Sequence, residues 1–350
     1  MKPYSAMARR VDPLLLASGC VTNMSKSPAT DPFRFHGGRL AAAALHFADA
    51  PKPWIDLSTG ISPWAYPVPE LGLDAWRRLP EPEQIADLEL AAARVFGLNN
   101  TAEIVAVPGS DMAIRMLGAL FANQRGAMLT PIYSGHKAAW PNASEITIEE
   151  AAGHDLIILA NPNNPDGRIV SPDHLGAFPG QVIVDEAFAD TAPATSILPE
   201  RGDAIVLRSF GKFYGLAGIR LGFVIADTAV AERLRAMLGD WPISGIAATV
   251  GLAAYQDQQW QEVQRHRLQE AAERLDRLFE KSEIEIVGGT SLFRLISHDN
   301  ARELFEILGQ SGILVRPFSD DASRLRFGLP GGEDEWRRLD YALSQWREMQ

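Results

Sequence analysis

Short aliphatic runs alternate with helical patterns between residues 104 and 225, and this alternation restricts the possible folds more than any other feature of the chain. A strand that is followed by a helix and then by another strand needs a crossover connection, which is how parallel sheets are built. The sequence therefore predicts an α/β fold with a mainly parallel sheet between helices. The strands that we expect are 104–107, 127–129, 156–159, 182–184, 205–207 and 221–225.

After Trp241-Pro242 the pattern changes to long helical stretches over 246–256 and 260–281. The pair Gly288-Gly289 is expected to precede a strand at 291–296. Strands near 313–315 and 325–327 and a helix from Glu333 complete a smaller α+β unit. We expect a large domain over 85–240 and a C-terminal domain over 241–350. Residues 1–30 lack periodicity and are expected to form a flexible extension.

Composition excludes several classes of protein. The formal charge of −11 argues against a nucleic-acid partner, because a phosphate backbone needs a basic face. The single cysteine excludes an internal disulfide and fits a reducing cytoplasm. No apolar stretch approaches the roughly 20 residues needed to span a bilayer, and the apolar run over 14–20 is too short for a signal peptide. We expect a cytoplasmic protein without a membrane contact.

The segment SFGKFYGLAGIR, residues 209–220, carries one lysine among small and apolar residues. Desolvation lowers the pKa of a lysine, so more neutral amine is available to attack an aldehyde. Ser209 and Arg220 suit a phosphate, as a hydroxyl donor and a charged fork. An amine beside a phosphate site is what pyridoxal phosphate requires. The alternative is a lysine in an ordinary surface loop.

Two polar residues follow strand-like runs upstream of this lysine. NPNNPDG, residues 161–167, comes directly after an apolar run, so the amide of Asn164 is expected at the carboxyl end of a strand. Asp185 closes the run QVIV. A buried carboxylate needs a partner, and a protonated pyridine nitrogen would be one; the alternative is that Asp185 caps a loop.

The turn VPGSD, residues 107–111, stands between a strand and a helix. Glycine permits a close backbone approach, and a helix start offers unpaired amides to a phosphate. An ordinary helix cap by Ser110 or Asp111 is the alternative. We expect Asp111 to contribute its backbone amide and not its carboxylate.

The segments NPNNPDG, DEAF and SFGKFYGLAGIRLG resemble the signature of fold-type I pyridoxal-phosphate enzymes, in the branch of the histidinol-phosphate aminotransferases. HGGR, at 36–39, and WIDLSTGISP, at 54–63, resemble the opening of the L-threonine-O-3-phosphate decarboxylases of cobalamin synthesis. The resemblance implies a large domain with a seven-stranded sheet, a smaller α+β domain, an arm over 31–84 that packs with that smaller domain, and a homodimer. It also implies decarboxylation of L-threonine O-3-phosphate to (R)-1-aminopropan-2-ol O-phosphate.

The resemblance assigns roles to individual residues, and it implies no metal. Around the cofactor ring, Lys212 would be the Schiff-base lysine, Asp185 the partner of the pyridine nitrogen, Asn164 the donor to the phenolic oxygen, Tyr133 the stacking residue and His136 the partner of Asp185. The cofactor phosphate would lie among Gly109, Ser110, Asp111, Ser209 and Arg220. The substrate carboxylate would bind Arg326 beside the backbone of Gly60, and the substrate phosphate would bind His36 and Arg39.

Two departures from the family pattern bear on the reaction. Phe188 replaces a tyrosine that donates to the phenolic oxygen in many aminotransferases, and Leu79 replaces a tyrosine that reaches the neighbouring subunit's cofactor in histidinol-phosphate aminotransferases. The second departure favours decarboxylation. The alternatives are an aminotransferase acting on histidinol phosphate and a sensor that binds the cofactor without turnover. A Rossmann dehydrogenase is disfavoured because no G-x-G-x-x-G follows the first strand.

Overall fold

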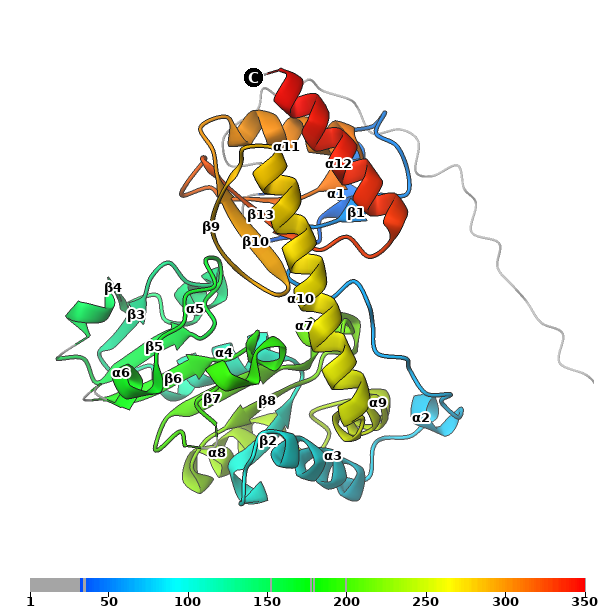
Figure 1. Cartoon of the computed structure of the whole chain (residues 1–350). Helices are drawn as coiled ribbons and strands as arrows, with labels where there is room; N and C mark the ends of the chain where they lie inside the picture. Colours follow the sequence, from blue (N-terminus) through cyan, green and yellow to red (C-terminus); the bar gives the residue numbers. More distant parts are fainter. Residues whose placement is uncertain are drawn as a thin grey trace, which may run out of the picture. The chain divides into compact units, whose positions relative to one another are not determined.

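A seven-stranded sheet dominates the computed structural model, in the order β2-β8-β7-β6-β5-β3-β4 (Figure 1). Only β8 runs antiparallel to its neighbours. The central strands β5, β6 and β7 are rich in aliphatic residues and largely buried, as expected for a sheet covered on both faces. The strands are β2 (Ile104–Val107), β3 (Gly126–Leu129), β4 (Ser144–Ile146), β5 (Leu156–Ala160), β6 (Gln181–Asp185), β7 (Ile205–Ser209) and β8 (Gly222–Ile225).

The mainly parallel α/β fold is confirmed, and one strand of the sheet was not predicted. β4 is a short edge strand, and its first two residues, Ser144 and Glu145, are exposed. Short charged edge strands lack the aliphatic run that marks a central strand. The prediction therefore missed it.

Helices cover both faces of this sheet. Alternate residues of β2 enter two different cores: Ile104 and Ala106 one, Val105 and Val107 the other. The first core also holds α3 and α9, and the second holds α4 and α8. The helices of this part are α3 (Pro82–Val95), α4 (Ser110–Leu120), α5 (Ser134–Ala139), α6 (Pro172–Gly176), α7 (Phe210–Phe213), α8 (Thr228–Leu238) and α9 (Gly245–Gln256), with 3-10 turns at Thr101–Glu103, Ile148–Glu150, Ala189–Thr191, Pro193–Thr195 and Ala217–Ile219.

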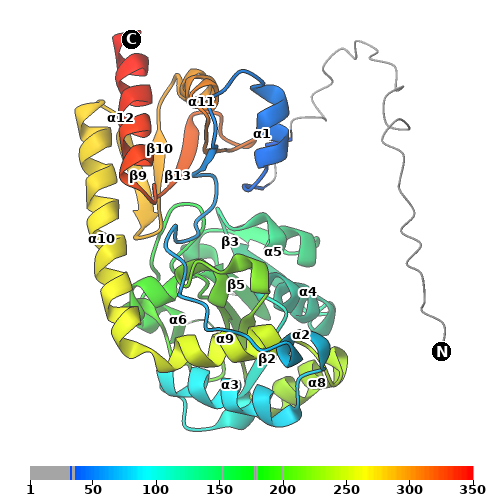
Figure 2. The same ribbon diagram turned by 90° about the vertical axis from the view of Figure 1, so that its right-hand side faces the viewer.

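A four-stranded antiparallel sheet forms the C-terminal domain, in the order β12-β13-β10-β9. Its long helix α10 runs from the region of α9 up to this sheet (Figure 2). The ring of Phe279 on α10 lies 5.0 Å from that of Phe327 on β13. The elements are α10 (Gln258–Lys281), β9 (Glu285–Thr290), β10 (Phe293–Ser297), α11 (Ala301–Gln310), β11 (Ile313–Leu314), β12 (Arg316–Pro317), β13 (Arg324–Gly328) and α12 (Glu333–Glu348).

The sequence analysis did not predict β9. Gly288 and Gly289 precede β10, as expected, and both lie inside β9. β9 is the edge strand, and an edge tolerates glycine where another backbone approaches it closely.

The segment before the large sheet contacts both parts of the molecule. α1 (Leu40–His46) precedes β1 (Ile55–Asp56), which pairs in parallel with β11. Farther on, the Ser62 amide donates to the Lys212 carbonyl at 2.9 Å, and the Tyr66 amide donates to the Tyr214 carbonyl at 2.9 Å. The stretch 63–82 contains the short helix α2 (Asp74–Arg77).

The structure describes residues 32–33, 36–151, 153–176, 178, 180–198 and 200–349, so the extension expected over 1–30 lies outside it. Residues Phe33–Gln350 belong to one folded unit. Within the described ranges, no helix has the length and apolar character required to cross a membrane.

Candidate active site

The predicted ring-binding residues gather at the carboxyl ends of three neighbouring strands. Asn164 follows β5, Asp185 ends β6, and Lys212 lies in α7, directly after β7. These strands are parallel neighbours in the sheet, with Ala160 opposite Asp185. Open α/β sheets bind ligands at this edge.

Asp185 is buried and held in one orientation. Its Oδ2 lies 2.9 Å from Nε2 of His136, which is fully buried on α5. Its Oδ1 accepts from the Ala187 amide at 3.1 Å. The predicted pair of histidine and aspartate is therefore present, and it fixes the carboxylate at the end of β6.

Lys212 lies in the same enclosure. Burial, followed by the positive charge of Arg326, lowers the pKa of Lys212 to about 8, against the opposing effect of Asp185. Its Nζ lies 5.9 Å from the ring centroid of Phe188. A lysine in these surroundings offers neutral amine near physiological pH, which is the property that attack on an aldehyde requires.

The turn before α4 approaches Arg220 so closely that a side chain does not fit. Gly109 has φ +84°, and a Cβ there would lie 2.4 Å from Nη2 of Arg220. A Cβ on Gly222 would lie 2.8 Å from the amide nitrogen of Ser110. Together with Ser209 at the end of β7, the start of α4 and the guanidinium form a cradle that fits a phosphate.

Asp111 keeps its carboxylate away from this cradle. Its Oδ2 accepts from Nε of Arg115 at 3.2 Å, and its Oδ1 accepts from the hydroxyl of Tyr133 at 3.3 Å. Burial and the nearby Asp111 carboxylate raise the pKa of Tyr133, so its hydroxyl stays a donor. Both carboxylate oxygens of Asp111 thus have protein partners, and the use of its amide for a phosphate stays a prediction.

Arg326 joins the C-terminal domain to the site. The side chain is 4% exposed; Nη1 donates to Oδ1 of Asn164 at 2.6 Å, and Nη2 donates to the Ser58 carbonyl at 3.2 Å. Burial and then the charge of Arg316 lower the pKa of Arg326 to about 9. A Cβ on Gly60 would lie 3.0 Å from the ring of Phe188 and 3.1 Å from that of Phe293, so these rings fill the space that a side chain would need.

The N-terminal motif lies at the rim of the same site. The ring centroids of His36 and Tyr133 are 6.2 Å apart. Burial and the charge of Arg316 lower the pKa of His36, and the exposed Arg39 acts in the same direction. The Gly38 amide donates to the Ser58 hydroxyl at 2.7 Å. His36 thus lies close to Tyr133, and Arg39 is near enough to His36 for its charge to act on it.

Two residues near the site were missed by the sequence analysis. Arg316 lies directly opposite Arg326 in the C-terminal sheet, and its charge lowers the pKa of Lys212, Arg326 and His36. Ser58 accepts from both Arg326 and Gly38. The sequence offered one indication of each: Arg316 is a single arginine inside the apolar run ILVRPF, and Ser58 lies inside the motif WIDLSTGISP.

A buried ion network lies on the other side of the site strands. Nη1 of Arg208 donates to Oε2 of Glu186 at 3.0 Å, and Nη2 donates to Asp190. Glu186 also accepts from the Ser196 hydroxyl at 2.6 Å. Arg208 precedes Ser209, and Glu186 follows Asp185, so the network anchors the two strand ends that carry site residues.

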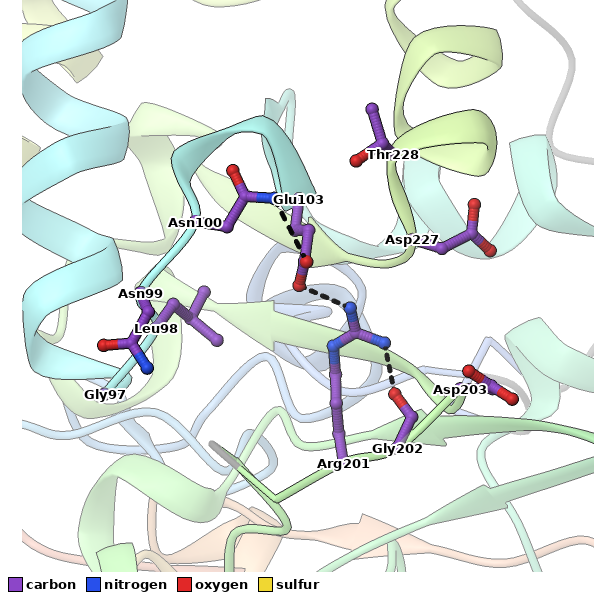
Figure 3. Close-up of a pocket in the computed structure, with 10 residues that line it drawn as sticks. All are labelled: Gly97, Leu98, Asn99, Asn100, Glu103, Arg201, Gly202, Asp203, Asp227 and Thr228. Carbon is purple, nitrogen blue, oxygen red and sulfur yellow. Dashed lines mark hydrogen bonds and ion pairs between the residues drawn. The ribbon is translucent and has the colours of Figure 1, made fainter.

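The pocket drawn in Figure 3 is a different place. It lies where β2 and β7 begin and β8 ends, which is the opposite edge of the sheet from Lys212. Arg201 crosses it, with Nη2 donating to Oε2 of Glu103 at 2.6 Å. None of the predicted site residues lines it. In the part of the chain that the structure describes, no three His, Cys, Asp or Glu side chains are grouped to hold a metal ion.

Comparison of the sequence with known proteins identifies a family for the chain. Residues 138–343 match the family described as aminotransferase class I and II. Threonine-phosphate decarboxylase of Pseudomonas aeruginosa is 38% identical over 330 residues, covering 89% of this chain and 98% of that protein. The Sinorhizobium sp. protein of the same name is 36% identical over 328 residues, covering 89% of this chain and 97% of that protein.

The fold comparison agrees. Histidinol-phosphate aminotransferase from Sinorhizobium meliloti, solved in complex with pyridoxal 5'-phosphate, superposes with a TM-score of 0.76 at 21% identity, over 88% of this chain and 94% of that one. The chain belongs to the class I and II aminotransferase family of pyridoxal-phosphate-dependent enzymes and, within it, to the threonine-phosphate decarboxylases.

Proposed function

We propose that this protein decarboxylates L-threonine O-3-phosphate to (R)-1-aminopropan-2-ol O-phosphate and carbon dioxide, as a step of cobalamin biosynthesis in the cytoplasm. The observation that carries the proposal is the enclosure of Lys212 by two fixed contacts, Asp185 with His136 and Arg326 with Asn164. The threonine-phosphate decarboxylases of Pseudomonas aeruginosa and Sinorhizobium sp. are matched over nearly their whole length, which supports the same reaction.

When bound, pyridoxal 5'-phosphate supplies an aldehyde for an amine and a ring that takes up the electron pair of a broken Cα bond. Lys212 provides the amine, and Asp185, oriented by His136, holds the proton of the ring nitrogen. Asn164 donates to the phenolic oxygen, a task that Phe188 cannot share. Gly109, Ser110, Asp111, Ser209 and Arg220 hold the cofactor phosphate.

Arg326 and the rim residues decide which bond breaks. Arg326 binds the α-carboxylate, while His36 and Arg39 bind the substrate phosphate. Holding both ends of the substrate fixes the torsion about Cα, and binding energy at the remote phosphate then favours loss of carbon dioxide over loss of the Cα proton. Lys212, or a bound water, would return a proton to Cα.

The test is to incubate the purified holoenzyme separately with L-threonine O-3-phosphate and with histidinol phosphate. We expect carbon dioxide and aminopropanol phosphate from the first, with the cofactor absorbance restored after each turnover. Accumulation of pyridoxamine phosphate with histidinol phosphate, without gas release, would establish the aminotransferase instead. Lys212→Ala should abolish turnover, and retained activity in that variant would refute the assignment of the lysine.

We also propose a homodimer and the domain limits 31–84, 85–240 and 241–350. Exposed apolar side chains gather on and around α2 and before α9: Leu73, Trp76, Leu79 and Trp241 are each more than half exposed. α2 packs against α9, so these side chains belong to one region. Trp76→Glu is expected to shift the mass measured by sedimentation towards that of the single chain.

A further inference from the structure

At its edge strand β9, the C-terminal sheet meets the Asn164 turn through backbone atoms. The Gly289 amide donates to the Asp166 carbonyl at 2.8 Å. A Cβ on Gly288 would lie 2.0 Å from the Asp166 oxygen, and a Cβ on Gly167 would lie 2.0 Å from the Gly289 oxygen. The edge strand β9 and the turn that carries Asn164 therefore touch at a distance that only glycine permits.

Gly288 has no conformational need to be glycine. The residues with positive φ include Gly167 and Gly289 but not Gly288. Alanine could adopt its backbone conformation, so the space in front of Asp166 is what excludes a side chain. Glycine is therefore required at position 288 because β9 lies so close to Asp166, and not because the backbone turns there.

The register of the C-terminal sheet connects this glycine to Arg326. Gly288 lies opposite Leu295 of β10, Leu295 lies opposite Arg326 of β13, and Arg326 lies opposite Arg316 of β12. Directly opposite residues of antiparallel strands point to the same face. The side chains of Arg316, Arg326 and Leu295 thus share one face of the sheet with Gly288, which has no side chain.

The neighbouring row points the other way. Arg294 of β10, opposite Gly289, forms an ion pair with Asp276 of α10. Phe327 of β13, opposite Arg294, packs on Phe279 of the same helix. α10 covers that face, so the row of Gly288 and Arg326 is the one that faces the site.

The irregularity in β9 falls at this point. The pairing with β10 shifts between Leu295 and Ile296, whose partners are Gly288 and Ile286, so Val287 is the extra residue. Bulges re-aim an edge strand and often occur beside active sites. Here the bulge directly precedes the glycine that contacts Asp166.

We infer that Gly288 is a positioning residue: its missing side chain lets the C-terminal sheet rest on the Asn164 turn, and this sets the distance at which Arg326 meets Asn164 and the substrate carboxylate. The inference rests on the proposed roles of Arg326 and Asn164. A methyl group at 288 would push β9 away from Asp166. Because Arg326 lies in the same row of the sheet, its guanidinium would move away from Asn164.

The test compares Gly288→Ala with Gly72→Ala in the holoenzyme. Gly72 is exposed, has no positive φ, and an added Cβ there meets nothing within 4 Å. For Gly288→Ala we expect faster hydrogen–deuterium exchange in the peptide covering 161–170 and about a tenfold rise in KM for L-threonine O-3-phosphate, with a smaller change in kcat. Gly72→Ala should match the unmodified protein in both measurements.

A melting temperature that falls in Gly288→Ala while KM and exchange stay unchanged would overturn the inference, because a merely structural glycine behaves in that way. The exchange measurement does not depend on the substrate, so it still decides the matter if the protein does not turn over threonine phosphate. Should Gly288→Ala not fold, the unmodified protein is measured alone: slow exchange of the Gly289 amide supports the contact, and fast exchange overturns it.

Discussion

The reactivity of Lys212 can be tested in the cofactor-free protein. A pKa of about 8 leaves about one-tenth of the amine neutral at pH 7, whereas a lysine at its ordinary value near 10.5 would leave about one in three thousand. The rate at which the protein takes up pyridoxal 5'-phosphate, followed by absorbance, should rise about tenfold per pH unit and level off near pH 8. A rate that still rises steeply above pH 9.5 would refute the lowered pKa.

The second cause of that shift is testable separately. The charge of Arg326 lowers the pKa of Lys212, so Arg326→Met should move the plateau to higher pH and slow cofactor uptake at pH 7. Arg324→Met is the matched control, because Arg324 lies two residues earlier on β13 and pairs with Asp321 at 2.9 Å. An identical plateau in Arg326→Met and Arg324→Met would contradict the electrostatic argument.

Three further substitutions probe the rest of the site. Gly109→Ala places a Cβ 2.4 Å from the Arg220 guanidinium and should weaken cofactor binding at least about tenfold in an absorbance titration, whereas Gly218→Ala, whose Cβ meets nothing within 4 Å, should not. Arg208→Met leaves two buried carboxylates without their partner and should lower the free energy of unfolding by about 3–5 kcal/mol in urea. Asp185→Asn should still bind the cofactor but lose about ten- to hundredfold in kcat; a near-normal rate would count against its role.

Much of the site could be predicted because its residues follow strands that the sequence marks clearly. Asn164, Asp185 and Lys212 each come after an aliphatic run, and parallel strands bring such ends together. Arg316 could not be found in this way. Its place beside Lys212 depends on the pairing of β12 with β13, and pairing between short strands of a separate sheet leaves no local signal.

The same limit explains why β9, which contains Gly288 and Gly289, was not predicted. Within one sequence, two adjacent glycines indicate a break, because glycine weakens a strand that must pack its side chains. The structure places them at an edge whose neighbour is the backbone of another segment. Only the tertiary contact distinguishes a glycine that ends a strand from a glycine that lets a strand pack closely against another backbone segment.

The buried ion network of Arg208, Glu186 and Asp190 also affects the register of β6 against β7. Asp185 and Glu186 are adjacent acids, and the Glu186 amide donates to the Leu207 carbonyl of β7. If β6 slipped by one residue against β7, Asp185 and Glu186 would exchange faces of the sheet. The buried guanidinium of Arg208 would then lose its contact with Glu186. A chain with that misalignment would be less stable, so the network favours the register in which Asp185 faces the cofactor site.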